Sequence, residues 1–306
     1  MLEVNHNLLL DFQVPTAQQW TPLLIICGMD DCPAGATGDE VQAHMTWDPA
    51  NGSSVVSCLA AARENARIIR EVISAEMWER VNHDYLWINS PAARNLYDGH
   101  RTEFYNRIRL INQLLHGVGD ATMSHGEAWE FCRLGRYLER GSQTARILDV
   151  KYHVLLPRVE DVGSPIDHAY WTAILMSCSG YEPFHKTPRA GGLDAGLAVV
   201  EFLVYDPLFP RSVARCLQEC WAAAAAISAS PAGRPATPVE LTIADLQAWL
   251  AGRDIRTLVR AGLHESLTEV IDRIDAVGAA AHATYFDARP TPAAPAGGQT
   301  QRQTQG

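Results

Sequence analysis

The sequence predicts an all-α protein, and three observations support this prediction. Apolar or small residues recur at alternating steps of three and four over residues 131–155, the spacing of one buried stripe on a long helix. Similar spacing returns in other segments, and no series of alternating strands is found. The composition, with 47% hydrophobic and 20% charged residues in a chain of 306, is typical of a globular protein with a sizeable core.

Helices are expected along most of the chain. A stripe from Val55 to Ile73 predicts a helix that ends near Trp87, and this helix and the one at 131–155 should each exceed about five turns. Further helices are expected at 102–118, 254–286, 17–27, 166–182, 211–228 and 239–251. Loops rich in Gly and Pro are expected at 28–40, 186–196 and 228–238. The polar tail at 289–306 is expected to be disordered.

Two parts of the sequence resemble each other in the same order. MLEVNHNLLL at the start matches ILDVKYHVLL from Ile147, and WTPLLIICG from Trp20 matches WTAILMSCSG from Trp171. Later blocks match as well: Trp47, Asp48, Pro49, Ser54 and Cys58 fall on Tyr205, Asp206, Pro207, Ser212 and Cys216. We therefore expect one domain at 1–288, built from two degenerate repeats at about 1–125 and about 126–286 with a pseudo-two-fold relation. The apolar stripes of the two halves are expected to pack against each other.

The first repeat begins in mid-helix. Its match to the second repeat starts at Ile147, so the segment LGRYLER at 134–140 has no counterpart in the first copy. The sequence thus predicts a first helix that is truncated at the N-terminus. It also predicts that in-frame DNA upstream of Met1 encodes a segment similar to LGRxxER.

Composition excludes several classes of function. A formal net charge of −10 argues against nucleic acid or an anionic membrane surface as the main partner. The N-terminus has no secretory signal and no apolar run approaches about 20 residues, so a cytoplasmic protein is expected. The seven cysteines contain no CxxC pair, and neither a disulfide framework nor a metal site is expected.

Charged and polar residues flank the stripes of two expected long helices. The candidates for a polar network or a substrate-binding surface are Arg63, Glu64, Asn65, Arg67, Arg70, Glu76 and Asn82 in the first, and Arg136, Glu139, Arg140, Thr144 and Asp149 in the second. They could form a solvated face, in which exposed pairs contribute only about 0.3–0.5 kcal/mol each. Alternatively, Glu139 with Arg140 or Arg136 meets Arg63 and Arg67 between helices, where loss of one partner would cost about 3–5 kcal/mol. Such a network would fix helix register or bind an anionic ligand.

An aromatic residue, Asp and Pro precede a helix in each repeat. In the second repeat, Asp206, Arg211 and Ser212 join the candidates. Asp accepts hydrogen bonds from N–H groups ahead of it and Pro fixes its own φ, so a helix-start device with no chemical role is the simpler interpretation. Dedicated catalytic signatures such as GxSxG, a P-loop, GxGxxG or HExxH are absent from the sequence.

Six motifs occur in an order that resembles a known family. They are AARENAR (61–67), EMWERVN (76–82), DATMSHGEAWEF (120–131), LGRYLER with QTARILDVKY (134–152), FLVYDPLFPRSV (202–213) and GLHESL (262–267). Together they resemble the bacterial α-E domain family, which is all-helical and named for a Glu-Arg motif. The resemblance implies an association with circularly permuted ATP-grasp ligases, in systems that also contain transglutaminase-like proteins.

The resemblance and the polar flanks lead to one expected function and two alternatives. We expect a helical partner subunit of an ATP-grasp-type amide (peptide) ligase, which presents an Arg/Glu-lined surface to an acidic or peptide substrate. No cofactor is expected in this chain, and ATP and Mg²⁺ are expected only on the partner ligase. The first alternative is a non-catalytic scaffold that holds the ligase and a transglutaminase-like protein together, with purely structural Glu-Arg pairs. The second is a stand-alone enzyme, for which the sequence offers no nucleophile or nucleotide motif.

Overall fold

The structure is a computed structural model, and it describes most of the chain. It covers Leu2, Val4, Trp20, Leu23, Leu24 and residues 36–154, 165–186, 195–228 and 236–287, with the backbone alone at 150–154 and 165–166. Every regular element in these parts is a helix, so the predicted all-α class is confirmed. The tail at 289–306, most of the helix expected at 17–27 and most of the three expected loops lie outside the described residues.

The first group of helices comprises α3 (Gly38–Trp47), α4 (Val55–Ile68), α5 (Ala75–Ile88), α6 (Pro91–Gly99) and α7 (Arg101–Thr122). Hydroxyl side chains cap the starts of four of them by accepting a backbone N–H bond: Thr37, Ser54, Ser74 and Ser90. Phe104 of α7 is fully buried, and aromatic rings surround it with centroids 5.2–5.8 Å away. This aromatic cluster ties α3, α5, α6 and α7 together.

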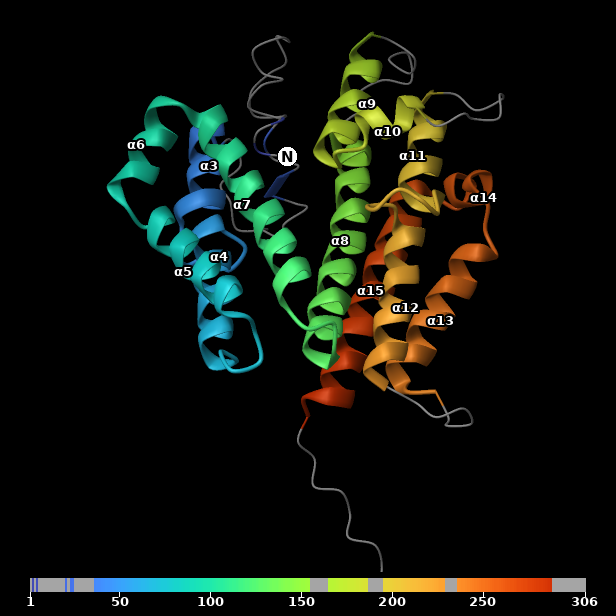
Figure 1. The fold of residues 1–306 in the computed structure, drawn as a ribbon. Coiled ribbons are helices and arrows are strands. Elements are labelled where there is room, and N and C mark those ends of the chain that lie inside the picture. Colours follow the sequence, from blue (N-terminus) through green and yellow to red (C-terminus); the bar gives the residue numbers. More distant parts are fainter. Residues whose placement is uncertain are drawn as a thin grey trace, which may run out of the picture.

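The second group is built around one long helix. It comprises α8 (Glu127–Val154), α9 (Pro165–Ser177), α10 (Tyr181–Lys186), α11 (Ala195–Tyr205), α12 (Val213–Ser228), α13 (Pro238–Ala251), α14 (Ile255–Arg260) and α15 (Leu263–Tyr285). Figure 1 shows α8 standing beside α12 and α15, which are the helices it packs against most extensively. Gly141 permits this packing, because a Cβ atom there would lie 3.3 Å from Cys216 Cβ and 3.4 Å from Ile274 Cδ1.

The clusters of buried apolar residues form within each group of helices, and Trp129 of α8 adds a contact to Gly119 of α7. Of the four clusters of buried residues in the described chain, two contain only residues of the second group and its flanking segments. The other two contain only residues that precede or belong to α3–α7, such as Trp20 and Phe104. Among the described residues, the expectation that the halves bury their stripes against each other is therefore wrong, while most of residues 1–27 lie outside the described part of the chain. Figure 1 shows the two groups side by side.

Matched local contacts support the duplicated unit. Asp48 and Asp206 each accept a hydrogen bond from the N–H two residues ahead, at 2.9 and 2.8 Å. Ser54 and Ser212 cap α4 and α12 through the N–H groups of Ser57 and Arg215. A tryptophan also covers a helix-starting glycine in each half: a Cβ atom on Gly38 would lie 2.5 Å from Trp20 Nε1, and one on Gly196 would lie 2.8 Å from Trp171 Nε1. The positions are those of the sequence match, while the pseudo-two-fold relation stays a prediction.

Three helices that the sequence predicts as continuous are interrupted. The helix expected at 166–182 is divided into α9 and α10, with residues 178–180 between them. The expected helix from Val55 to Trp87 is divided into α4 and α5, and Ser74 caps the second piece by accepting a hydrogen bond from Met77 N–H. The expected helix at 254–286 breaks into α14 and α15 at Gly262, whose φ of 99° lies in the left-handed region. In addition, α3, α6 and α11 are helices that the sequence patterns did not predict as such.

Candidate anion-binding site

Three arginines come together where α8 crosses the start of α12. Arg136 and Arg140 are one turn apart on α8, and Arg211 lies two residues before α12 begins. An Arg140 guanidinium N–H donates to the Pro210 carbonyl at 3.4 Å, and the Thr144 hydroxyl donates to the Arg211 carbonyl at 2.8 Å. The polar flank of α8 therefore holds the backbone segment that carries Arg211.

The turn before α12 is built by its own residues. The Asp206 carboxylate accepts hydrogen bonds from the N–H groups of Leu208 and Phe209, at 2.8 and 2.7 Å. Ser212 is fully buried, donates to the Asp206 carbonyl, and caps α12. Asp206 and Ser212 thus stabilise the start of α12, as the sequence suggested. Through these contacts they also fix the position of Arg211.

His116 of α7 faces the arginines from the first group of helices. Burial is the largest cause, and together with the charges of Arg136, Arg140 and Arg211 it lowers the pKa of His116 to about 4. The imidazole is neutral at pH 7 as a result. Sequence reasoning missed this residue, because a single histidine in NQLLHGV carries no signal until the α7–α8 hairpin places it opposite α8.

The arginine cluster is short of negative charge. Burial lowers the pKa of Arg136 and of Arg211, and the charge of Arg140 lowers both pKa values as well. The Arg136 Nε atom is buried and has no hydrogen-bond partner. Within the described parts of the chain, none of the three arginines forms an ion pair with a carboxylate. Such a concentration of desolvated guanidinium groups is the chemistry that binds carboxylate or phosphate.

Glu139, the residue before Arg140, acts on a residue of the first group of helices. Its side chain is exposed, and its charge adds to burial in raising the pKa of the Cys58 thiol on α4. The Glu-Arg dipeptide of α8 therefore presents its two charges to different neighbours: Arg140 to the start of α12, and Glu139 to α4. Acidic and basic groups both border the space between the two groups of helices.

The candidates on α4 and α5 form a separate set of contacts. Arg63 Nε donates to Asn82 Oδ1 at 2.8 Å, and the Arg63 guanidinium lies 4.8 Å from the centroid of Tyr85. Arg67 pairs with Glu64 at 2.6 Å on the surface, and Arg70 stacks on Trp78 at 5.1 Å. Asn65 and Glu76 are exposed, and Glu76 lies in the first turn of α5. The expected meeting of Glu139, Arg140 or Arg136 with Arg63 and Arg67 is therefore wrong, because Arg63 and Arg67 bond to Asn82 and Glu64 while Arg140 lies against the start of α12.

Asp149 has a structural contact near the other end of α8. Its Oδ1 atom lies 2.7 Å from Nδ1 of His264, in the first turn of α15. This pair links α8 to α15 and stands apart from the arginine cluster. In the described residues, no group of three or more His, Cys, Asp and Glu side chains is arranged to hold a metal ion. A search of the same residues for a helix long and apolar enough to cross a membrane found none.

Comparisons with known proteins give one result. A family model named Alpha-E, described as a predicted alpha-helical domain with a conserved ER motif, matches residues 1–286. The comparisons with curated proteins and with solved structures gave no match. The match extends over nearly all the described residues, including every candidate of the arginine cluster.

Proposed function

Because the chain belongs to the Alpha-E family, we propose that it is a helical partner subunit of an ATP-grasp-type amide ligase and binds the acidic group of the ligase's substrate. The observation that carries the binding role is the cluster of Arg136, Arg140 and Arg211, which has no carboxylate partner among the described residues. An anion bound there would supply the negative partner that these three partly desolvated cations lack. The partner ligase, with its ATP and Mg²⁺, is inferred from the resemblance of the sequence motifs to the family.

A direct binding experiment tests the first half of this proposal. His116 gives a site-specific signal, because an anion bound to the arginines shields the imidazole from their charge and raises its pKa from about 4. We expect N-acetyl-glutamate or a short glutamate peptide to shift the NMR titration of His116 to higher pH. The neutral glutamine analogue serves as the matched control. Equal shifts with both compounds, or no shift with either, would contradict an anion site.

An assay with the ligase tests the second half. The chain is co-purified with a candidate ATP-grasp ligase, and ATP turnover is measured with acidic amino acids or peptides. Arg211→Gln and Arg140→Lys are expected to reduce turnover at low substrate concentration while the complex stays intact. Arg63→Lys is the control, because Arg63 bonds locally to Asn82. Turnover that is the same with and without this chain would exclude the partnership.

A scaffold is the second candidate, and the exposed face of α4 favours it. Cys58 and Asn65 on α4 are exposed, whereas Cys216 and Ala223, which occupy the matching positions on α12, are fully buried against neighbouring helices. Ile69 and Leu114 add apolar side chains that are 42% and 48% exposed. An uncovered helix face of this kind is typical of a surface that contacts another protein. Loss of the complex on Ile69→Asp, with turnover unaffected by Arg211→Gln, would support the scaffold over the substrate-binding subunit.

A further inference from the structure

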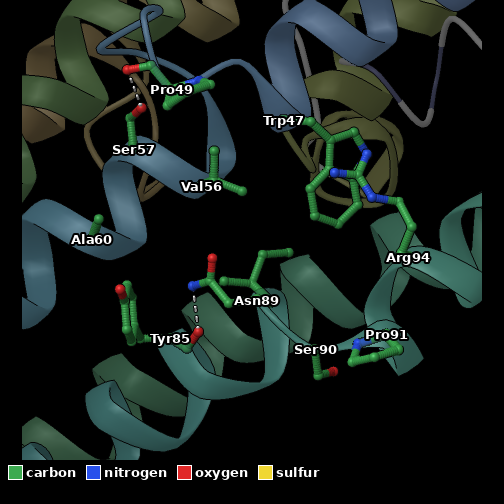
Figure 2. A pocket seen from close by; sticks show the side chains of 11 residues that line it. Trp47, Pro49, Val56, Ser57, Ala60, Tyr85, Asn89, Ser90, Pro91 and Arg94 are labelled. Carbon is green, nitrogen blue, oxygen red and sulfur yellow. Dashed lines mark hydrogen bonds between the residues drawn. The ribbon is translucent and has the colours of Figure 1, made fainter.

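A cavity lies within the first group of helices, apart from the arginine cluster. All the described residues that line it belong to α3–α6 and the turns between them. Figure 2 shows this open cavity of about 650 Å³ between the turn that follows α3, the first turns of α4, and the junction of α5 and α6. None of the eleven described residues that line it is acidic. The cavity is therefore a mainly apolar recess whose one formally charged lining group is a cation.

The cation is Arg94, in the first turns of α6. Its guanidinium lies 3.8 Å from the centroid of the Trp47 ring, a stacked position that restricts the side chain. Trp47 is itself held by Tyr97 and Phe104, both at centroid distances of 5.5 Å. Arg94 forms no ion pair with any carboxylate in the described parts of the chain. The Arg94 guanidinium is held by stacking on Trp47 and has no carboxylate partner, so it is preorganised to bind a carboxylate ligand.

The opposite end of the cavity is apolar and aromatic. In Figure 2, Tyr85 stands at the end away from Arg94, and Val56 and Asn89 lie between them. Ile88 is 1% exposed and contributes to the wall from the aromatic core. Asn89 and Ser57 use polar atoms in contacts to the carbonyls of Tyr85 and Pro49, so their arrangement is fixed without a ligand. These surfaces suit a ligand group that is apolar and flat or branched.

We propose that this cavity binds an apolar group that carries a single carboxylate, with the carboxylate on Arg94 and the apolar group against Val56, Ile88 and Tyr85. A single carboxylate matches this lining, because Arg94 is the one charged side chain among the described residues that line the cavity. The ligand chemistry is that of a hydrophobic or aromatic free acid, or of a peptide that ends in such a residue. This site does not depend on the proposed role of the arginine cluster.

Binding of N-acetyl-phenylalanine, measured by calorimetry or by ligand-observed NMR, tests the proposal. N-acetyl-phenylalanine amide lacks the carboxylate and is expected to bind at least about tenfold more weakly. N-acetyl-glutamate keeps the carboxylate but lacks the apolar group, and it should not compete. A peptide with a C-terminal phenylalanine, compared with its amidated form, distinguishes a peptide end from a free acid as the source of the carboxylate. No binding of any of these acids, or equal binding of acid and amide, would overturn the proposal.

Variants locate the binding in this cavity. Arg94→Gln is expected to weaken binding of the acid at least about tenfold, and Arg94→Lys to weaken it less, because an ammonium keeps the charge but not the planar fork. Ala60→Trp fills the cavity and should abolish binding of acid and amide alike. Arg260→Gln is the control for a changed surface charge, and Arg211→Gln separates this site from the arginine cluster. If Arg211→Gln weakens binding and Arg94→Gln does not, the proposed cavity is wrong whether or not Ala60→Trp folds.

Discussion

His116 and the three arginines show how burial and like charge act on a single residue. The imidazole is partly buried in a positive field, and its pKa falls to about 4. Arg211 is subject to the same two effects, so its positive charge is disfavoured in the folded state. Neither residue contributes to stability through an ion pair in the described structure, which is typical of residues kept for a ligand and not for the fold.

The His116 pKa leads to a pH dependence of stability. The unfolded state has the ordinary value near 6.5, so between about pH 6.5 and pH 4 it binds more protons than the folded state. The free energy of unfolding should therefore fall as pH decreases through this window. After a discount for partial exposure we expect a loss of about 1 kcal/mol. Urea unfolding at a series of pH values checks this, and His116→Gln should flatten the curve in that window.

Removal of one arginine charge should stabilise the protein without ligand. Arg211→Met relieves a desolvated charge beside Arg140, and we expect the free energy of unfolding to rise by about 1 kcal/mol. The same variant should raise the pKa of His116, a result that improved packing alone would not produce. Chemical unfolding and NMR titration measure the two effects, with Arg260→Met as the exposed control. A protein that is destabilised, with an unchanged His116 titration, would show that the arginines do not act on one another.

At the scale of the elements, the long helix α8 shows what sequence periodicity can predict. The stripe at 131–155 identified this helix and its buried face, and the structure places it at 127–154. The same reasoning joined α4 to α5, because no Gly or Pro lies between them and the cap at Ser74 resembles any other serine. Likewise, charged spacing found Arg136 and Arg140 as candidates, and the Asp-Pro element found Arg211, but the reasoning paired α8 with the wrong helix. The packing of α8 on α12 and α15 decides which neighbour each polar flank of α8 contacts. Helical periodicity in a single sequence does not predict that packing.

Two glycines on α8 provide a matched test of the helix contact. Gly141 faces Cys216 and Ile274 at contact distance, whereas nothing lies within 4 Å of a Cβ atom at Gly135. Gly141→Leu should destabilise by about 1–3 kcal/mol, since its side chain forces α8 away from α12. Gly135→Ala should stabilise by about 0.5–1 kcal/mol, because alanine favours the helix and meets no neighbour. Thermal unfolding compares the pair, and equal effects would mean that α8 does not approach α12 as closely as described.

At the scale of the whole molecule, the separated cores imply two regions with their own stability. Phe104 is fully buried in one aromatic cluster, and Leu217 is 2% exposed in the large cluster around α8 and α12. The described clusters share no residue across the two groups, so loss of packing in one need not open the other. The two groups are connected by the short turn between α7 and α8 and by Trp129 of α8, which is buried beside Gly119 of α7.

Hydrogen exchange can reveal this separation. Phe104→Ala removes about 3–5 kcal/mol of packing and should speed amide exchange in α3 and α5–α7, with little change in α12 and α13. Leu217→Ala, at a cost of about 2–5 kcal/mol, should do the reverse. Mass spectrometry of exchanged peptides compares the two variants. Equal acceleration throughout both groups in each variant would show a single cooperative unit.

The α7–α8 hairpin has a consequence for how a bound anion would act. His116 belongs to the first group of helices and Arg136, Arg140 and Arg211 to the second, and residues 123–126 connect α7 to α8. Any bending at that joint changes the spacing between the imidazole and the guanidinium groups. A ligand bound to the arginines would thus favour one angle between the two groups of helices. The same angle sets the distance between Glu139 and the exposed face of α4.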